Sequence, residues 1–179
     1  MDKKQLFAQL NEELEKAHIT LEIICVGGYL LELNNIRGTQ DIDAFYEDNA
    51  TITQIIHDIG ERNKANNDGE DWLNNSVANL NPTPPRHLCT TIFAYSNLTV
   101  LAPPLEYVIG MKMKSGRERD IADIGYILKE LNAQSPNDIE KTVQEYGFDA
   151  DMSLILSAFE SAYGMQWVVQ YLTNHSSEL

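Results

Sequence analysis

The spacing of apolar residues predicts a helix at the start of the chain and a mixture of strands and helices after it. Leu6, Phe7, Leu10 and Leu14 recur at intervals of three and four residues, which predicts a helix over residues 3–17. Apolar runs, alternation and turn residues predict the next elements. These are a strand over 19–28 that ends at a glycine pair, a helix over 29–35, a strand over 40–47, a helix over 50–65, a short helix over 71–80, a loop over 81–87 and a hairpin of strands over 88–95 and 98–104.

The last third of the chain has helical spacing only. We expect helices near 105–115, 117–132, 136–146 and 151–173. Strands followed by a helical block predict an α+β fold, in which a small mixed sheet is flanked by helices and followed by a helical C-terminal part. We expect residues 1–104 to form the core and residues 105–179 to pack on it as one compact unit. The apolar segment 153–172 predicts burial in the domain, or in a dimer or partner interface.

The net charge of the chain excludes some classes of function. The chain has 27 Asp and Glu against 13 Lys and Arg, a net charge of −14, which argues against broad binding to nucleic acids or anionic membranes. No segment approaches a membrane span, and the first helix is amphipathic rather than a signal peptide, so we expect a cytoplasmic protein. Cys25 and Cys89 lie in apolar runs, which predicts buried, reduced thiols in strands.

Two aspartates one residue apart are the first candidate site. Side chains alternate along a strand, so Asp41 and Asp43 point to the same face. Two carboxylates so close repel each other unless a cation lies between them. Mg²⁺ suits such a pair because it prefers oxygen ligands and takes its remaining ligands from water and substrate phosphates. We therefore predict that Asp41 and Asp43 bind a metal.

The glycine pair and the loop after it are the second candidate. Gly27 and Gly28 follow a strand and precede a helix, where backbone N–H groups can approach a phosphate. A tight turn explains the pair equally well. Arg37 and Thr39 lie between the glycines and the aspartates, and two interpretations are open for them. They contact a phosphate, or they belong to a tight loop in which Arg37 pairs with an acidic neighbour.

A basic cluster in an acidic chain is the third candidate. Lys112, Lys114, Arg117 and Arg119 fall within eight residues, and Asp120 and Asp123 follow at helical spacing. One interpretation is a solvated helix with ion pairs. The other is that Lys112 and an arginine face the carboxylate site and hold a triphosphate.

Two stretches resemble a known superfamily. "VGGYLLEL…IRGTQDIDAFYE" resembles the signature of the polymerase-β-type nucleotidyltransferases, and "MKMKSGRERDIADIGYIL" resembles a second block of their abortive-infection-type branch in bacterial toxin–antitoxin systems. The resemblance implies Mg²⁺ and a nucleoside triphosphate whose nucleotidyl group is transferred to a hydroxyl. It implies a phosphate turn at Gly27 and Gly28 and metal ligands at Asp41 and Asp43. Lys112 matches the lysine of the second block, and Asp120 and Asp123 match its acidic pair.

The chain departs from this pattern at one point. Many members have a third carboxylate on a later strand, but the predicted strands over 88–95 and 98–104 contain no acidic residue. The nearest preceding acids are Asp68, Glu70 and Asp71. Either Asp120 completes the site, or the site is incomplete and the protein is an inactive binding or interaction module. The acceptor is a protein, a small molecule or tRNA, and the net charge favours the first two. A homo-oligomer or a toxin–antitoxin partner is also open.

Overall fold

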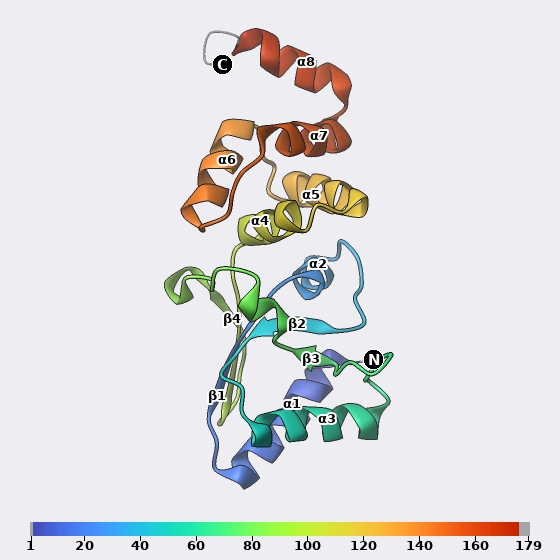
Figure 1. Ribbon diagram of the computed structural model, residues 1–179, viewed down its shortest axis with the longest axis vertical. Coiled ribbons are helices and arrows are strands. Elements are labelled where there is room, and N and C mark those ends of the chain that lie inside the picture. The colour runs from blue at the N-terminus through green and yellow to red at the C-terminus, as the bar shows by residue number, and fades with distance from the viewer. Residues whose placement is uncertain (1, 176–179) are drawn as a thin grey trace. The chain divides into compact units, whose positions relative to one another are not determined.

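The computed structural model describes residues 2–175, apart from the side chain of Glu118 (Figure 1). The chain divides into two compact units, one up to Pro104 and one from Leu105. The first contains all the strands that the described residues form, and the second is helical. The α+β class predicted from the sequence is therefore confirmed.

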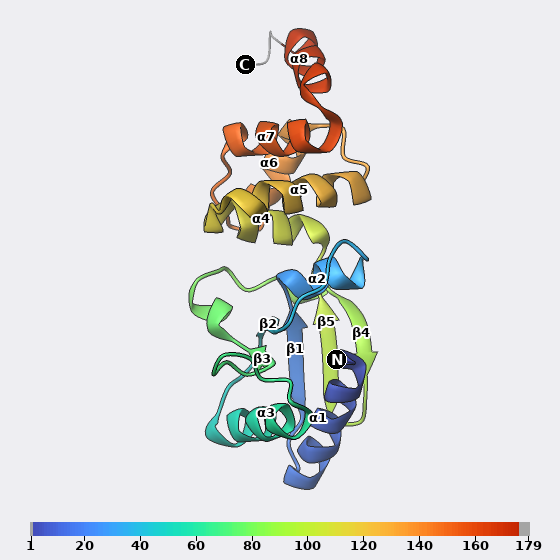
Figure 2. The same cartoon turned by 90° about the vertical axis from the view of Figure 1, so that its right-hand side faces the viewer.

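A five-stranded mixed sheet organises the first unit (Figure 2). Its strand order is β3-β2-β1-β5-β4, with β1 antiparallel to β2 and parallel to β5. The pairs β2/β3 and β4/β5 are parallel and antiparallel respectively, and the predicted hairpin is β4/β5. The strands are β1 (Leu21–Cys25), β2 (Ile42–Phe45), β3 (Leu73–Asn74), β4 (Thr90–Ala94) and β5 (Leu98–Ala102).

Helices α1 (Lys3–Ala17) and α3 (Ala50–Asn63) lie side by side on one face of this sheet (Figures 1 and 2). Each begins at a side-chain cap: Asp2 accepts from the backbone N–H of Lys4, and Asn49 accepts from two backbone N–H groups of α3. The apolar stripe of α1 is fully buried, which confirms the helix predicted over 3–17. Burial of each such side chain contributes about 1.5–3 kcal/mol. The short helix α2 (Gly28–Leu33) follows β1 after Val26 and Gly27.

The prediction of a short helix over 71–80 is partly wrong. Residues Leu73–Asn74 form β3, and only Ser76–Asn79 form a 3₁₀ turn, η1. A second 3₁₀ turn, η2 (Arg86–Leu88), overlaps the end of the loop predicted over 81–87 and the first residue of the strand predicted over 88–95. Trp72, the residue before β3, anchors this segment beside β2. Its carbonyl accepts a hydrogen bond from the Ile42 backbone N–H at 2.8 Å, and its indole N–H donates to the Ile56 carbonyl at 3.0 Å. Pairing with β2 therefore overrides the local preference.

The second unit is built from five helices in its described residues. The predicted helix over 151–173 is two helices, because Gly164 adopts φ 90° and ψ 160° between them. The apolar segment 153–172 is only partly buried: Met165 and Val169 are each 54% exposed. The helices are α4 (Leu105–Ser115), α5 (Glu118–Glu130), α6 (Pro136–Glu145), α7 (Met152–Tyr163) and α8 (Met165–Asn174).

The two cysteines differ from each other. Cys25 is a buried free thiol in β1, as predicted. Cys89 is also free, but it is only partly buried and precedes β4 rather than lying in it, so that part of the prediction is wrong. Among residues 2–175, no helix combines the length and apolar character that a membrane crossing requires.

Candidate functional site

The glycine turn makes room for the carboxylate of Asp43. Gly27 follows β1 with φ 63° and ψ −137°, a conformation that only glycine adopts readily. A Cβ atom on Gly27 would lie 2.9 Å from Asp43 Oδ2, closer than real Cβ contacts. β2 holds Asp43 there, because the Val26 backbone N–H donates to the Asp43 carbonyl at 2.8 Å. The absence of a side chain at Gly27 is therefore needed for the chain's own carboxylate.

Gly28 makes room in the same way for Thr39. A Cβ atom on Gly28 would lie 2.9 Å from Thr39 Oγ1. That hydroxyl donates to Asp41 Oδ1 at 3.1 Å. Consecutive glycines thus accommodate Asp43 directly and Asp41 through Thr39. The structure brings Gly27, Gly28, Thr39, Asp41 and Asp43 together at the end of β1.

Lys3 and Glu32 belong to the same assembly, and sequence reasoning missed both. Lys3 is 6% exposed, and its ammonium donates to Glu32 Oε2 at 2.5 Å and to the Thr39 carbonyl at 2.7 Å. Glu32 Oε2 also accepts from the Thr39 backbone N–H at 2.9 Å. Burial raises the pKa of Glu32, but the bonds from Lys3 and Thr39 outweigh burial and bring this pKa below its usual value. The available signal was that Lys3 continues the apolar stripe of α1.

Arg37 lies on the exposed part of the loop between α2 and β2. Its Nη1 donates to the Gly38 carbonyl at 3.3 Å, so its guanidinium contacts the loop that carries it. Asn35 turns the chain in the same loop with φ 57°. These contacts fit the tight-loop interpretation, and an exposed guanidinium is also suited to a phosphate.

The position beside Asp43 on the next strand is occupied by Asn74. β3 is parallel to β2 and pairs Asn74 with Asp43, so both side chains belong to the same face of the sheet. Asn74 Oδ1 accepts from the Ser76 hydroxyl at 2.6 Å and from its backbone N–H at 3.3 Å. Within the described residues, no three His, Cys, Asp or Glu side chains gather as a metal site. The strand adjacent to Asp43 thus offers an amide rather than a third carboxylate.

The acids that precede the hairpin in the sequence, Asp68, Glu70 and Asp71, do not supply a third carboxylate beside Asp43. Glu70 and Asp71 line a small pocket of about 90 Å³ together with Asp41. Asp71 is paired with His57 at 2.8 Å, and this hydrogen bond raises the pKa of His57. Asp68 adopts φ 48° in an exposed turn. Asp43 in β2 and Asp41, the residue just before this strand, therefore remain the core of the candidate site.

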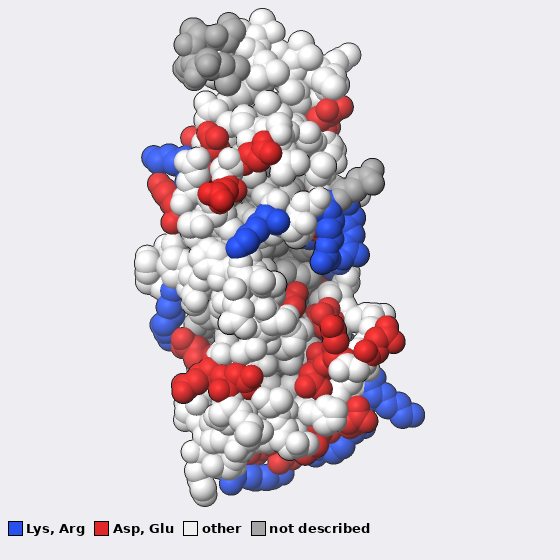
Figure 3. All heavy atoms as spheres, in the orientation of Figure 1, with Lys and Arg blue, Asp and Glu red and all other residues white. Residues whose placement is uncertain are grey.

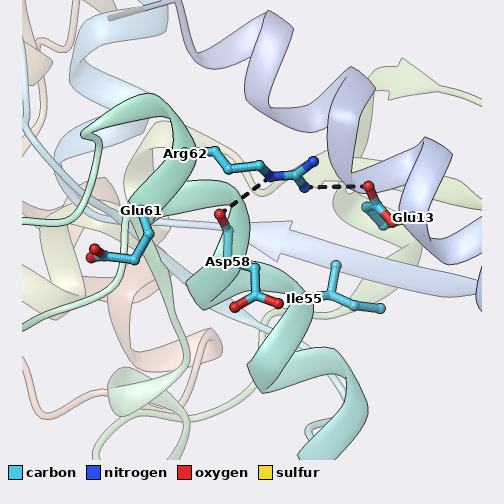
Figure 4. A pocket seen from close by; sticks show the side chains of 5 residues that line it. All are labelled: Glu13, Ile55, Asp58, Glu61 and Arg62. Atoms are coloured by element: carbon cyan, nitrogen blue, oxygen red, sulfur yellow. Dashed lines mark hydrogen bonds and ion pairs between the residues drawn. The ribbon is translucent and has the colours of Figure 1, made fainter.

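A larger groove in this unit does not have the chemistry of a triphosphate site. It has a volume of about 470 Å³ and lies between α1 and α3 (Figure 4). Glu13, Asp58 and Glu61 line it, and Arg62 bonds to the Glu13 carboxylate and to the Asp58 carbonyl. Figure 3 shows that acidic side chains predominate over basic ones on the visible face of the first unit. Three carboxylates repel an anionic ligand from this groove.

The second unit gathers the other predicted residues around Lys112. Its ammonium donates to Asp120 Oδ1 at 2.9 Å and to Asp123 Oδ2 at 2.5 Å. All three residues are at most 8% exposed, so the ion pairs are buried rather than solvated. Burial raises the pKa of Asp120, but bonds from Ser115 and Lys112 outweigh it and hold this pKa below its usual value. Arg117 is exposed and precedes α5.

The predicted residues therefore form two groups. Asp41, Asp43 and the glycine turn form one within the first unit, and Lys112 with its two aspartates forms the other within the second. The oxygen ligands of the first group fit a hard cation such as Mg²⁺, which needs only one or two carboxylates when phosphates and waters complete its shell.

Comparison with known families covers both groups. A family model described as "Nucleotidyltransferase of unknown function (DUF6036)" matches residues 4–133, more than half of the chain. The chain belongs to this family. The match includes the whole sheet of this nucleotidyltransferase, together with α4 and α5. No curated protein and no solved structure matches the chain.

Proposed function

We propose that this nucleotidyltransferase transfers a nucleotidyl group from a Mg²⁺-bound nucleoside triphosphate to a hydroxyl acceptor. The observation that supports this most strongly is the assembly of Asp41 and Asp43 against Gly27 and Thr39, within the region that the family covers. Asp41 and Asp43 would hold the metal, which would neutralise the phosphate charge. Gly27 and Gly28 lie beside these carboxylates, and Arg37, on the loop between α2 and β2, would bind a phosphate of the nucleotide.

The reaction makes one bond and breaks one. The acceptor oxygen bonds to the α-phosphorus, the bond from that phosphorus to the pyrophosphate oxygen breaks, and the acceptor loses its proton to a base. Because the net charge of −14 disfavours tRNA, a protein or small-molecule acceptor is proposed. The resemblance of residues 105–128 to the abortive-infection branch supports a place in a bacterial toxin–antitoxin system.

Calorimetric titration with a non-hydrolysable nucleoside triphosphate, with and without Mg²⁺, tests the proposal. The wild type is compared with Asp41→Asn/Asp43→Asn and with a control, Asp58→Asn/Glu61→Gln, which removes the same charge from exposed positions of α3. We expect Mg²⁺-dependent binding by the wild type and the control, and its loss in the Asp41/Asp43 variant. If none of the four nucleotides binds the wild type, or if the Asp41/Asp43 variant binds as the wild type does, the proposal is wrong.

A second candidate function is a binding or interaction module without catalysis, and Asn74 favours it. A neutral amide whose oxygen already accepts two hydrogen bonds is a weaker metal ligand than a carboxylate. We expect Asn74→Asp to strengthen Mg²⁺-dependent nucleotide binding by about tenfold, which corresponds to about 1.4 kcal/mol. Under this second function, nucleotide turnover is absent in the wild type and appears in Asn74→Asp. Turnover by the wild type excludes it.

A further inference from the structure

Lys3 connects α1 to the loop that carries the candidate metal ligands. It is the first residue of α1, yet its ammonium reaches Glu32 in α2 and Thr39 before β2. It also lies 5.5 Å from the centre of the Tyr29 ring. An ammonium has three donor hydrogens, and these contacts engage it with a carboxylate, a carbonyl and a π face. The charge of Lys3 is thus directed to the protein's own loop.

Thr39 is held at three of its polar atoms. Its carbonyl accepts from Lys3, its backbone N–H donates to Glu32, and its hydroxyl donates to Asp41 Oδ1. The absence of a side chain at Gly28 leaves room for Thr39 in this position, because a Cβ on Gly28 would lie 2.9 Å from Thr39 Oγ1. A continuous series of hydrogen bonds therefore runs from the start of α1 to one carboxylate oxygen of Asp41.

We propose that Lys3 is a positioning residue for the metal site, which fixes Thr39 and through it the orientation of the Asp41 carboxylate. The effect of Lys3 on metal binding rests on the proposed function. The fixing of Thr39 rests on contacts within the first unit alone. Without the Lys3 ammonium, Thr39 loses the bond to its carbonyl and Glu32 loses its cationic partner, so the loop gains freedom before Asp41 binds a cation. Ordering that loop then opposes metal binding.

Two measurements on four variants test this. The variants are Lys3→Met, the conservative Lys3→Arg, a control Lys4→Met at the neighbouring exposed lysine, and Thr39→Val, which removes only the bond to Asp41. The first measurement is hydrogen exchange of the Thr39 amide by NMR in metal-free protein. The second is the Mg²⁺ concentration that gives half-maximal binding of a non-hydrolysable nucleoside triphosphate.

We expect Lys3→Met to accelerate Thr39 exchange by about tenfold or more and to raise the half-maximal Mg²⁺ concentration by about tenfold. In Lys3→Arg, which keeps the positive charge, we expect the Thr39 exchange rate and the half-maximal Mg²⁺ concentration to stay within about threefold of the wild type. In Lys4→Met we expect neither quantity to change. Thr39→Val raises the Mg²⁺ requirement with Lys3 in place, so the proposal is tested even if Lys3→Met does not fold.

Unchanged Thr39 exchange in Lys3→Met refutes the inference. So does faster exchange with an unchanged Mg²⁺ requirement, or a normal Mg²⁺ requirement in Thr39→Val. If the wild type binds no nucleotide with Mg²⁺, the proposed function fails. Thr39 exchange alone then decides the structural part, with faster exchange in Lys3→Met retaining it and unchanged exchange overturning it.

Discussion

Replacement of Gly27 by alanine tests whether this glycine is present for the Asp43 carboxylate. The backbone at Gly27, with φ 63° and ψ −137°, is unfavourable for any residue with a Cβ and costs about 1–3 kcal/mol. The new Cβ would also lie 2.9 Å from Asp43 Oδ2, so the carboxylate must retreat by a few tenths of an ångström. Gly69 is a control in the same unit, because it has φ 84° and a Cβ there would meet nothing within 4 Å.

The two tryptophans allow the first unit to be followed alone. Trp72 is buried in the first unit and Trp167 belongs to the second, so urea unfolding in a Trp167→Phe background reports the first unit. With a slope of about 1–3 kcal/mol per molar urea, we expect Gly27→Ala to lower the midpoint by about 1 M. Gly69→Ala costs about 1–2 kcal/mol from its backbone alone.

Nucleotide binding separates the two substitutions. We expect Gly27→Ala to weaken Mg²⁺-dependent binding by about tenfold or more, because it displaces a proposed metal ligand, whereas Gly69→Ala leaves binding unchanged. The reasoning is refuted if Gly27→Ala is as stable as the wild type within about 0.5 kcal/mol, or if both variants affect binding equally.

Two further predictions concern ion pairs. Lys112→Met leaves two buried aspartates without the ammonium that pairs with them, so we expect the free energy of unfolding of the second unit to fall by about 3–5 kcal/mol. Trp167 fluorescence during urea unfolding measures this change. The control Lys129→Met, at an exposed position, should change stability by less than about 0.5 kcal/mol, and equal effects of the two substitutions would contradict the role of burial. Asp71 raises the folded-state pKa of His57 above the unfolded value of about 6.5, so this pair stabilises the fold below that pH and ceases to do so as pH rises through the raised pKa. Urea midpoints of wild type and His57→Gln should therefore differ at about pH 6 and converge near pH 9, and a gap that persists would rule this out.

Elements with their own periodicity could be predicted, whereas elements made by distant partners could not. The apolar stripe of α1 and the alternation of β2 are local properties. The first helix lies where predicted, whereas β2 (Ile42–Phe45) is shorter than the strand predicted over 40–47, so that Asp41 precedes it. β3 is only two residues long and exists through its pairing with β2, so no local pattern indicates it. The apolar pattern also continues across Gly164. The backbone conformation of Gly164 divides α7 from α8, but the pattern of apolar residues does not indicate this break.

The candidate site shows the same limit. The spacing of Asp41 and Asp43, together with the glycine pair, predicted a cluster that the structure brings together. The contribution of Lys3 depends on a contact between residues far apart in the sequence, which spacing cannot supply. For Lys112, the sequence indicated the aspartate partners at helical spacing, but whether the group is solvated depends on how the helices pack.

The position of β1 in the sheet has a consequence for synthesis of the chain. β1 pairs with β2, which follows closely, but its other neighbour is β5, where Leu98 pairs with Leu21. A nascent chain therefore carries the glycine turn and both aspartates while residues 46–97 are still being made, a delay of several seconds at about 5–20 residues per second. During that interval one edge of β1 is open to other strands. The segment that carries the candidate site is thus made early, and β5, the second neighbour of β1, is made only after it.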